Sequence, residues 1–235
     1  MSSATSALAL IPARGGSKRL PRKNILLFAG RPMLAWTVTA AIESGVFDSI
    51  VVSTDDEEIA VLARAAGATV LIRHAAISDD KATLVDVVHH ALINGYGAVE
   101  RFCLLLANCP LRNAEDIRHS EQLFRARRPP ALLSVVNYGW TPPFRAQFMR
   151  DHKLHPAFEG WTNTKSQLYP EVMCPSGAIY WSNAQALAQS ETLYIEGLEG
   201  FPMPWYRGID IDTCEDLALA ACIRHSLDHG FCFEG

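Results

Sequence analysis

The segment LALIPARGGSKRLPRKN, residues 8–24, determines how the rest of the chain is interpreted. It begins with an apolar run typical of a buried strand and continues into a loop with two adjacent glycines. Five cations lie in this loop: Arg14, Lys18, Arg19, Arg22 and Lys23. Glycines let backbone N–H groups approach a ligand closely, and a strand that leads into such a loop is typical of a polyphosphate site.

Two common phosphate-binding motifs do not describe this loop. No GK[ST] sequence closes it, so it is not a P-loop, and the GxGxxG pattern of dinucleotide-binding folds is absent. The alternative is a solvated basic loop with no ligand. Loops that follow strand ends commonly carry function, which favours a ligand site.

The composition limits the domain organisation, the kinds of partner and the cellular compartment that we expect. The 235 residues are 49% hydrophobic and 20% charged, which suits a single α/β domain over residues 1–235. The net charge of −4 argues against general nucleic-acid binding. We expect neither a signal peptide nor a membrane span, because no long apolar run occurs. The six cysteines form no CxxC pair, which indicates core thiols in a reducing cytoplasm.

The apolar pattern predicts alternating strands and helices. This alternation is typical of a Rossmann-like, mostly parallel sheet flanked by helices, with ligands at the carboxyl ends of its strands. Adjacent His89 and His90 point in different directions on a helix, so we expect structural roles for them. The expected strands are residues 8–12, 49–53, 69–72, 102–106, 131–136, 177–181 and 208–212, and the expected helices are 33–44, 54–66, 83–94, 113–127, 183–189 and a closing helix from 213.

Residues 138–176 break this pattern. They contain five prolines, which forbid a regular central strand or helix, and seven large aromatic residues, most of which are unlikely to face water. The segment therefore reads as an insert that buries itself on a second subunit. The alternative is a lid that folds onto its own subunit.

Asp210 and Asp212 have the period-two spacing that places both carboxylates on one face of the expected strand 208–212. Two such acids repel each other unless a cation joins them, and Mg²⁺ uses one or two carboxylates together with phosphate oxygens. The alternative is a pair of solvated acids at a strand end. Beside a triphosphate loop, the pair predicts a site for Mg²⁺ or Mn²⁺.

The basic loop, IPARGGSKRLPRKN, resembles the CTP-binding signature of the cytidylyltransferases that activate 3-deoxy-2-keto sugar acids. These are the CMP-sialic acid synthetases and their relatives for legionaminic, pseudaminic and 3-deoxy-octulosonic acids. The resemblance implies that a sugar hydroxyl attacks the α-phosphate of CTP and pyrophosphate leaves. It also implies a metal held by the DxD acids and an insert that pairs two subunits.

The resemblance implies a role for each part of the loop. Arg14 and Lys23 would contact phosphates near the reacting centre, and Asp212 would favour the attacking alkoxide through the metal. The outer phosphates and the rest of CTP would be held by further residues of this segment, namely Gly15, Gly16, Ser17, Lys18 and Asn24.

Three later segments extend the resemblance. Residues 73–83 resemble the RPxxLSxD segment that lies against cytosine, which implies CTP contacts for Arg73 and Ser78. Residues 105–112 resemble LQPTSPLR, with Leu106 where sialate enzymes have glutamine, and place Asn108 at the sugar. Residues 163–167 resemble the NTRSQ of pseudaminate enzymes and place Lys165 and Gln167 at the sugar acid of the neighbouring subunit.

Lys165 replaces an arginine of that motif, which keeps the charge and loses a bidentate clamp on a carboxylate. Residues 176–180 instead resemble the NGAIY of sialate enzymes, so the segment is mixed. Pseudaminic acid is the first expectation, with legionaminic or N-acylneuraminic acid as alternatives. A sugar-1-phosphate nucleotidyltransferase and a nucleotide-binding regulatory module without turnover also stay open.

Overall fold

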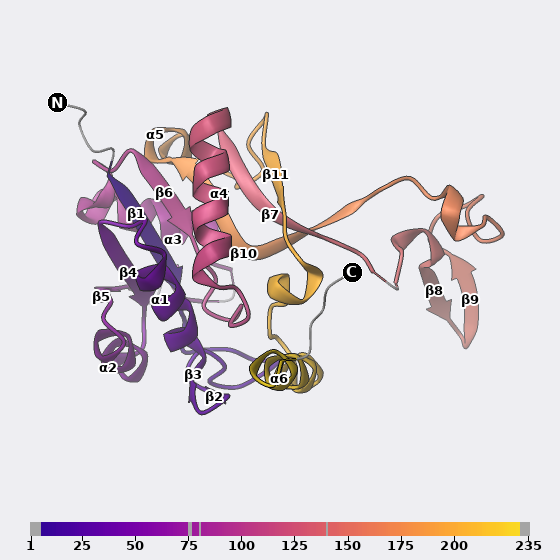
Figure 1. The fold of residues 1–235 in the computed structure, drawn as a ribbon, viewed down its shortest axis with the longest axis horizontal. Helices are drawn as coiled ribbons and strands as arrows, with labels where there is room; N and C mark the ends of the chain where they lie inside the picture. The colour runs from indigo at the N-terminus through magenta and orange to yellow at the C-terminus, as the bar shows by residue number, and fades with distance from the viewer. Residues whose placement is uncertain (1–5, 75–76, 80, 140, 231–235) are drawn as a thin grey trace.

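The computed structural model describes residues 6–74, 77–79, 81–139 and 141–230. Residues of the sequence analysis that lie outside these ranges include Ala75, Ala76, Asp80, Trp140 and Cys232. Within them, the main sheet has seven strands in the order β11-β7-β10-β6-β1-β4-β5 (Figure 1). The strands are β1 (Ala7–Pro12), β4 (Ser49–Thr54), β5 (Thr69–Ile72), β6 (Arg101–Leu104), β7 (Ala131–Asn137), β10 (Met173–Asn183) and β11 (Glu199–Pro202).

The sheet is mostly parallel, as predicted. Strands β6, β1, β4 and β5 pair in parallel, and β11 is parallel to β7, while β10 runs antiparallel to both of its neighbours. The strands next to the basic loop, β1 and β4, are almost continuously buried, because helices cover both faces of the sheet. The fold class predicted from the sequence is therefore confirmed.

One face of the sheet is covered by α1 (Met33–Ser44), α2 (Glu57–Ala65) and α4 (Ala114–Arg127). Their apolar side chains pack with those of Ile11, Val52 and Trp181 in one core cluster. The opposite face is covered by α3 (Leu84–Ala91) and α5 (Ala184–Ala188), which pack with Leu10 and Phe102. This burial fixes the sheet, and with it the positions of the loops at its carboxyl edge.

The last helix, α6 (Cys214–Asp228), packs under the basic loop instead of on the sheet (Figure 1). Ala220 and Ile223 form a third cluster with Leu20, Phe28 and Met33. A short hairpin of β2 (Leu27–Phe28) and β3 (Arg31–Pro32) belongs to the same region. The last helix therefore packs against the chain that follows β1 and supports the basic loop.

The expected strand at 208–212 is wrong. A 3-10 turn, Trp205–Gly208, precedes residues that have no regular structure, and the edge of the sheet is taken by β11, which the sequence analysis missed. Pro202 is the last residue of β11 and Pro204 directly precedes the 3-10 turn, which suits a residue that cannot donate to a strand ladder and favours a turn. Asp210 and Asp212 therefore do not share a strand face.

The insert at 138–176 contains more regular structure than its prolines indicated. It carries the antiparallel hairpin of β8 (Gln147–Arg150) and β9 (Lys153–Pro156), and β10 begins at Met173 within it. Pro175 is tolerated in β10 because the strand is irregular between Pro175 and Tyr180. Figure 1 shows the hairpin projecting away from the sheet at the end of the long strands β7 and β10.

Candidate active site

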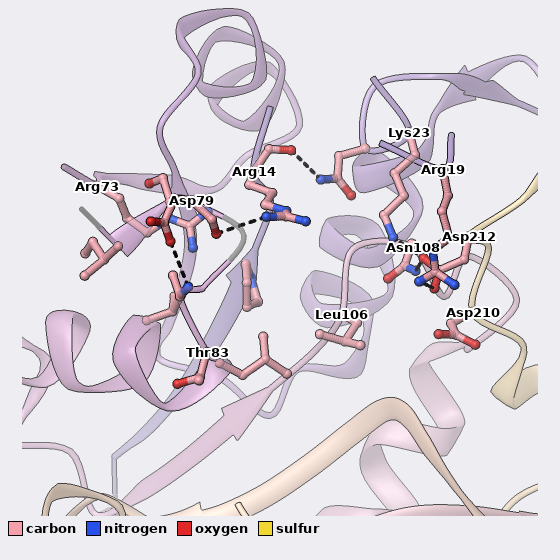
Figure 2. Close-up of a pocket in the computed structure, with 17 residues that line it drawn as sticks. Arg14, Arg19, Lys23, Arg73, Asp79, Thr83, Leu106, Asn108, Asp210 and Asp212 are labelled. Carbon is pink, nitrogen blue, oxygen red and sulfur yellow. Dashed lines mark hydrogen bonds and ion pairs between the residues drawn. The ribbon is translucent and has the colours of Figure 1, made fainter. Parts of the chain in front are cut away.

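A cavity of about 310 Å³ lies at the carboxyl edge of the sheet, beside the ends of β1, β5 and β6. Its walls come from the basic loop, from residues 73–84, from the loop after β6 and from the segment before α6. Figure 2 shows two separate groups of charged side chains in it. We label the two groups by the roles that the sequence analysis expects in this region: Arg14, Arg73, Ser78 and Asp79 form the nucleoside end, and Arg19, Lys23, Asn108, Asp210 and Asp212 form the transfer end.

Backbone contacts fix the start of the basic loop over the sheet. The Ala13 N–H donates to Ser53 O at 2.9 Å, which continues the pairing of β1 with β4. The buried Asn24 donates from Nδ2 to Arg14 O at 2.9 Å and so joins the two ends of the loop. A Cβ on Gly15 would lie 2.6 Å from Asp56 Oδ2, so this close approach requires glycine.

Arg73 at the nucleoside end is a buried cation with unused donors. Its N–H donates to Thr54 O at 2.7 Å, and the residue is only 6% exposed. Within the described chain, its Nε and Nη2 atoms have no hydrogen-bond partner, and the carboxylate of Asp55 lies 3.8 Å from Nη2. Such buried donors are costly unless an acceptor arrives, which makes Arg73 a candidate ligand contact.

The electrostatic environment of Arg73 agrees with this geometry. Burial lowers the pKa of the guanidinium from its ordinary value, the carboxylate of Asp55 opposes that shift, and the charge of Arg14 adds to it. Arg14 itself donates from Nη1 to Asp79 O at 3.1 Å, and Ser78 donates to His74 O at 3.0 Å. At the nucleoside end, hydrogen bonds of Arg14 and Ser78 therefore surround a cation that remains charged.

The transfer end is organised by Asp212. Lys23 and Arg19 both form ion pairs with its carboxylate, and the Lys23 side chain is 18% exposed against 69% for Arg19. Asn108 donates from Nδ2 to Ile211 O at 3.2 Å and to Asp212 Oδ1 at 3.4 Å, while Ile211 N–H donates to Asn108 O at 2.9 Å. This double contact holds the segment before α6 against the cavity although it is not a strand.

Asp210 is also at the transfer end. Although the residue stays exposed at the rim of the cavity, partial burial of its carboxyl raises its pKa, and the negative charge of Asp212 raises it further. Its neighbour Asp212 is countered by two cations. Two carboxylates and a nearby amide oxygen are hard donors, and Mg²⁺ typically takes one or two carboxylates and completes its shell with phosphate oxygens and water.

The chemistry of this donor set therefore fits Mg²⁺, with Asp210 and Asp212 as the residues that would hold it. Among the described side chains, no group of three or more His, Cys, Asp or Glu is arranged to hold a metal ion. His89, one of the two adjacent histidines, instead bonds through Nε2 to Leu187 O at 2.9 Å, as expected for a structural role.

The cavity brings together most, but not all, of the residues that the sequence indicated. The predicted residues that line it are Arg14, Lys23, Asn24, Arg73, Ser78, Asn108, Asp210 and Asp212. Gly15, Gly16, Ser17 and Lys18 belong to the same loop but do not line the cavity. Lys165 and Gln167 are exposed in the insert and do not line the cavity of their own chain.

Sequence reasoning gave no role to several residues that line the cavity, among them Arg19, Asp79, Thr83 and Leu106. Arg19 was counted among the loop cations but given no role, and its pairing with Asp212 requires the folded chain. Asp79 and Thr83 lie in the segment that supplied Arg73 and Ser78, so their position was a usable signal. Leu106 packs closely on Gly177, where an added Cβ would lie 2.1 Å from Leu106 Cδ1.

A family model described as cytidylyltransferase matches residues 8–139, which contain the basic loop, Arg73 and Asn108. The chain belongs to the cytidylyltransferase family. A relative named pseudaminic acid cytidylyltransferase, from Campylobacter jejuni, is 31% identical over 231 residues, with 96% of this chain and 99% of the relative covered. This cytidylyltransferase is thus a nucleotidyltransferase, as the resemblance of its basic loop indicated.

Two further comparisons concern proteins that are named for other sugar acids. A CMP-N,N'-diacetyllegionaminic acid synthase from Legionella pneumophila is 32% identical, with 90% of this chain and 93% of the relative covered. A solved structure of a CMP-2-keto-3-deoxy-manno-octonic acid synthetase complexed with CTP has a TM-score of 0.72 at 17% identity, covering 94% of this chain and 99% of that one. At that identity, the structural likeness concerns the fold.

Proposed function

We propose that this cytidylyltransferase transfers the CMP group of CTP to a nonulosonic acid, with pseudaminic acid as the first candidate, and releases pyrophosphate. The observation that carries the proposal is the cavity with Arg73 at one end and Lys23, Asp210 and Asp212 at the other. Its support is the match along 96% of the chain to a relative named for pseudaminic acid. Cytosine would contact the nucleoside end and the α-phosphate the transfer end.

The reaction follows from this placement. The anomeric hydroxyl oxygen of the sugar acid forms a bond to the α-phosphorus, the bond from that phosphorus to the bridging oxygen breaks, and pyrophosphate leaves with the electron pair. The hydroxyl proton passes to solvent. Catalysis then consists mainly of positioning and charge neutralisation, which needs no covalent nucleophile.

The chain's own cations must change partners during this reaction. Lys23 and Arg19 are bound to Asp212 in the free protein, so an incoming triphosphate competes for them. Mg²⁺, or Mn²⁺ in its place, would neutralise phosphate charge and polarise the attacking hydroxyl when bound. Asp212, released from the two cations, would hold it together with Asp210.

Metal removal tests this part of the proposal. EDTA should abolish turnover, and added Mg²⁺ or Mn²⁺ should restore it. Asp212→Asn should lose about 100-fold or more in kcat, as expected for an interaction made in the transition state, and excess metal should not restore it fully. A fully active Asp212→Asn protein would show that the carboxylate serves only to pair Lys23.

The insert supports a homodimer. The β8–β9 hairpin exposes Phe148, Met149 and Leu154, and Leu168 is exposed further along. Large apolar side chains gathered on one projection favour a protein partner. A second copy of the chain would cover them and could bring Lys165 and Gln167 to the cavity of its partner.

A cytoplasmic location belongs to the same proposal. The five described cysteines are free thiols, which suits a reducing compartment. No helix within the described ranges is both long and apolar enough to cross a membrane.

Pyrophosphate release from a panel of substrates tests the function as a whole. CTP, UTP, ATP and GTP are combined with pseudaminic, legionaminic and N-acetylneuraminic acids and with sugar 1-phosphates. We expect turnover with CTP and a nonulosonic acid, and the highest kcat/KM with pseudaminic acid. Turnover with a sugar 1-phosphate alone would indicate the other class of nucleotidyltransferase, and CTP binding without any turnover would indicate a regulatory module.

A further inference from the structure

Asp55 occupies a central position between the two halves of the nucleotide site. It is the first residue after β4, and β4 lies between β1 and β5 in the sheet. The chain after β1 and the chain after β5 are both bonded to the end of β4, through Ala13 N–H to Ser53 O at 2.9 Å and Arg73 N–H to Thr54 O at 2.7 Å. A side chain at position 55 can therefore reach both neighbours.

The Asp55 carboxylate contacts both of them. Its Oδ1 atom accepts from the Gly15 N–H at 3.1 Å, and the same atom lies 3.8 Å from Arg73 Nη2. Gly15 belongs to the basic loop and Arg73 to the nucleoside end. A single oxygen thus lies between the basic loop and the cation whose Nε and Nη2 atoms have no hydrogen-bond partner in the described chain.

The neighbouring acids have other roles, which shows that Asp55 is not simply one of the acids at the start of α2. Asp56 caps the helix by accepting from Ile59 N–H at 3.0 Å. Glu57 accepts from Arg64 Nη1 at 3.2 Å on the helix surface. By itself, the negative charge of Asp55 beside the basic loop would repel a bound triphosphate. We therefore look for a favourable contribution of Asp55 that offsets this repulsion.

We propose that Asp55 is a positioning residue that holds the basic loop, through the Gly15 N–H, and the Arg73 guanidinium in one fixed relation, so that phosphate and nucleoside are bound together. This inference rests on the proposed function, because it assumes that CTP occupies the cavity. Asp55 contributes to the choice of cytosine by acting through Arg73. It does not touch the reacting atoms.

Binding measurements with three variants test the proposal. Asp55→Ala removes both contacts, Asp55→Asn keeps an oxygen for the Gly15 N–H but removes the charge that faces Arg73, and Glu57→Gln is the matched control from the same helix turn. Calorimetry measures the affinities of CTP, UTP and inorganic tripolyphosphate for each purified protein in the absence of sugar acid. Thermal unfolding checks that each variant is folded.

The direction in which CTP affinity changes in Asp55→Ala distinguishes a positioning role of Asp55 from simple repulsion of the triphosphate. We expect Asp55→Ala to weaken CTP about tenfold, to lower the preference for CTP over UTP, and to affect tripolyphosphate much less. Asp55→Asn should lie between Asp55→Ala and the parent, and Glu57→Gln should match the parent. Tighter or unchanged CTP binding in Asp55→Ala would overturn the proposal, because a bystander acid can only repel the triphosphate.

A double-mutant cycle identifies the route of the effect. If Asp55 acts through Arg73, then Asp55→Ala should change CTP affinity little in an Arg73→Met background. An equal loss in both backgrounds would contradict the proposed route. A parent protein that binds no CTP would refute the proposed function instead, so the two failures are distinguishable.

Discussion

The two ends of the cavity handle positive charge in opposite ways. At the nucleoside end, Arg73 is buried and keeps donors without a partner in the described chain. At the transfer end, Lys23 and the more exposed Arg19 are both paired with Asp212. The first end can receive polar acceptors with little rearrangement, whereas the second must exchange ion-pair partners before it binds phosphate. The nucleoside end should therefore control binding and the transfer end should control rate.

The largest expected effect lies at the transfer end. Lys23→Ala should lower kcat about 100- to 1000-fold, because it removes a donor that stabilises charge in the transition state. Arg19→Ala should have a clearly smaller effect, since most of its side chain is in solvent, where such interactions are weak. Steady-state kinetics at saturating CTP measures both. Equal losses in the two variants would contradict the difference in burial as their cause.

At the nucleoside end, the expected effect is on binding. Arg73→Met should raise KM for CTP about tenfold and change kcat much less, because it removes hydrogen bonds made equally in the ground state and the transition state. Circular dichroism serves as the check on folding. If kcat falls as much as kcat/KM while KM stays constant, the division of labour between the two ends is wrong.

The insert adds a second subunit to the comparison of the two ends of the cavity. Lys165 does not line its own cavity, so a role at the sugar carboxylate requires a second subunit. Lys165→Ala should raise KM for the sugar acid by about tenfold, as expected for a lost charge-assisted contact, and leave KM for CTP unchanged.

Mixed dimers provide the control. Lys165→Ala and Lys23→Ala chains that are inactive or impaired alone should regain activity when they are combined, because one composite site in the heterodimer is then intact. Sedimentation at assay concentration should report a dimer. A monomer, or no recovery in dimers demonstrated to be mixed, would contradict a shared site.

The smallest expected effect concerns stability. Because the pKa of Asp210 is raised in the folded protein, mainly by burial and then by Asp212, the folded state binds this proton more tightly than the unfolded state does. Ionised Asp210 therefore costs stability, and the cost grows as pH rises from the ordinary aspartate pKa of about 3.9 and is complete above the raised value.

Asp210→Asn should consequently unfold at a slightly higher temperature than the parent at pH 7, while its turnover falls. The stability gain should shrink as pH is lowered and disappear below the ordinary aspartate pKa. Thermal unfolding across this pH range measures the difference. A variant that is less stable than the parent at neutral pH would show that the carboxylate makes favourable contacts in the folded state.

Local signals in the sequence were enough to predict the four neighbouring parallel strands β6, β1, β4 and β5. Apolar runs gave β1, β4 and β5, and the glycine-rich basic loop located one wall of the cavity. These features depend on neighbouring residues, so pattern and period identify them. The direction of β10 and the edge position of β11 depend on pairing between distant segments, and no local pattern specifies that pairing.

The site, like the fold, combines features that local patterns predict with features that depend on contacts between distant segments. The roles of Lys23 and Asp212 were inferred separately from a charge-dense loop and a DxD spacing, and the expected shared strand face proved wrong. What brings Asp212 to the cavity is the contact of Asn108 with residues 211 and 212, which are 103 and 104 positions away in the chain. The spacing of the acids selected two residues that do line the cavity, but the shared strand face on which that prediction rested is absent.

The central claim is that this cavity transfers CMP from CTP to the hydroxyl of a nonulosonic acid, and phosphorus NMR of the reaction tests it most directly. CTP, Mg²⁺ and pseudaminic acid are incubated with the parent protein, and with Lys23→Ala as the control. The account predicts a phosphodiester resonance of a CMP-sugar and an equal amount of pyrophosphate, both strongly reduced in the variant. Formation of CDP with a sugar phosphate, or undiminished product from Lys23→Ala, would contradict it.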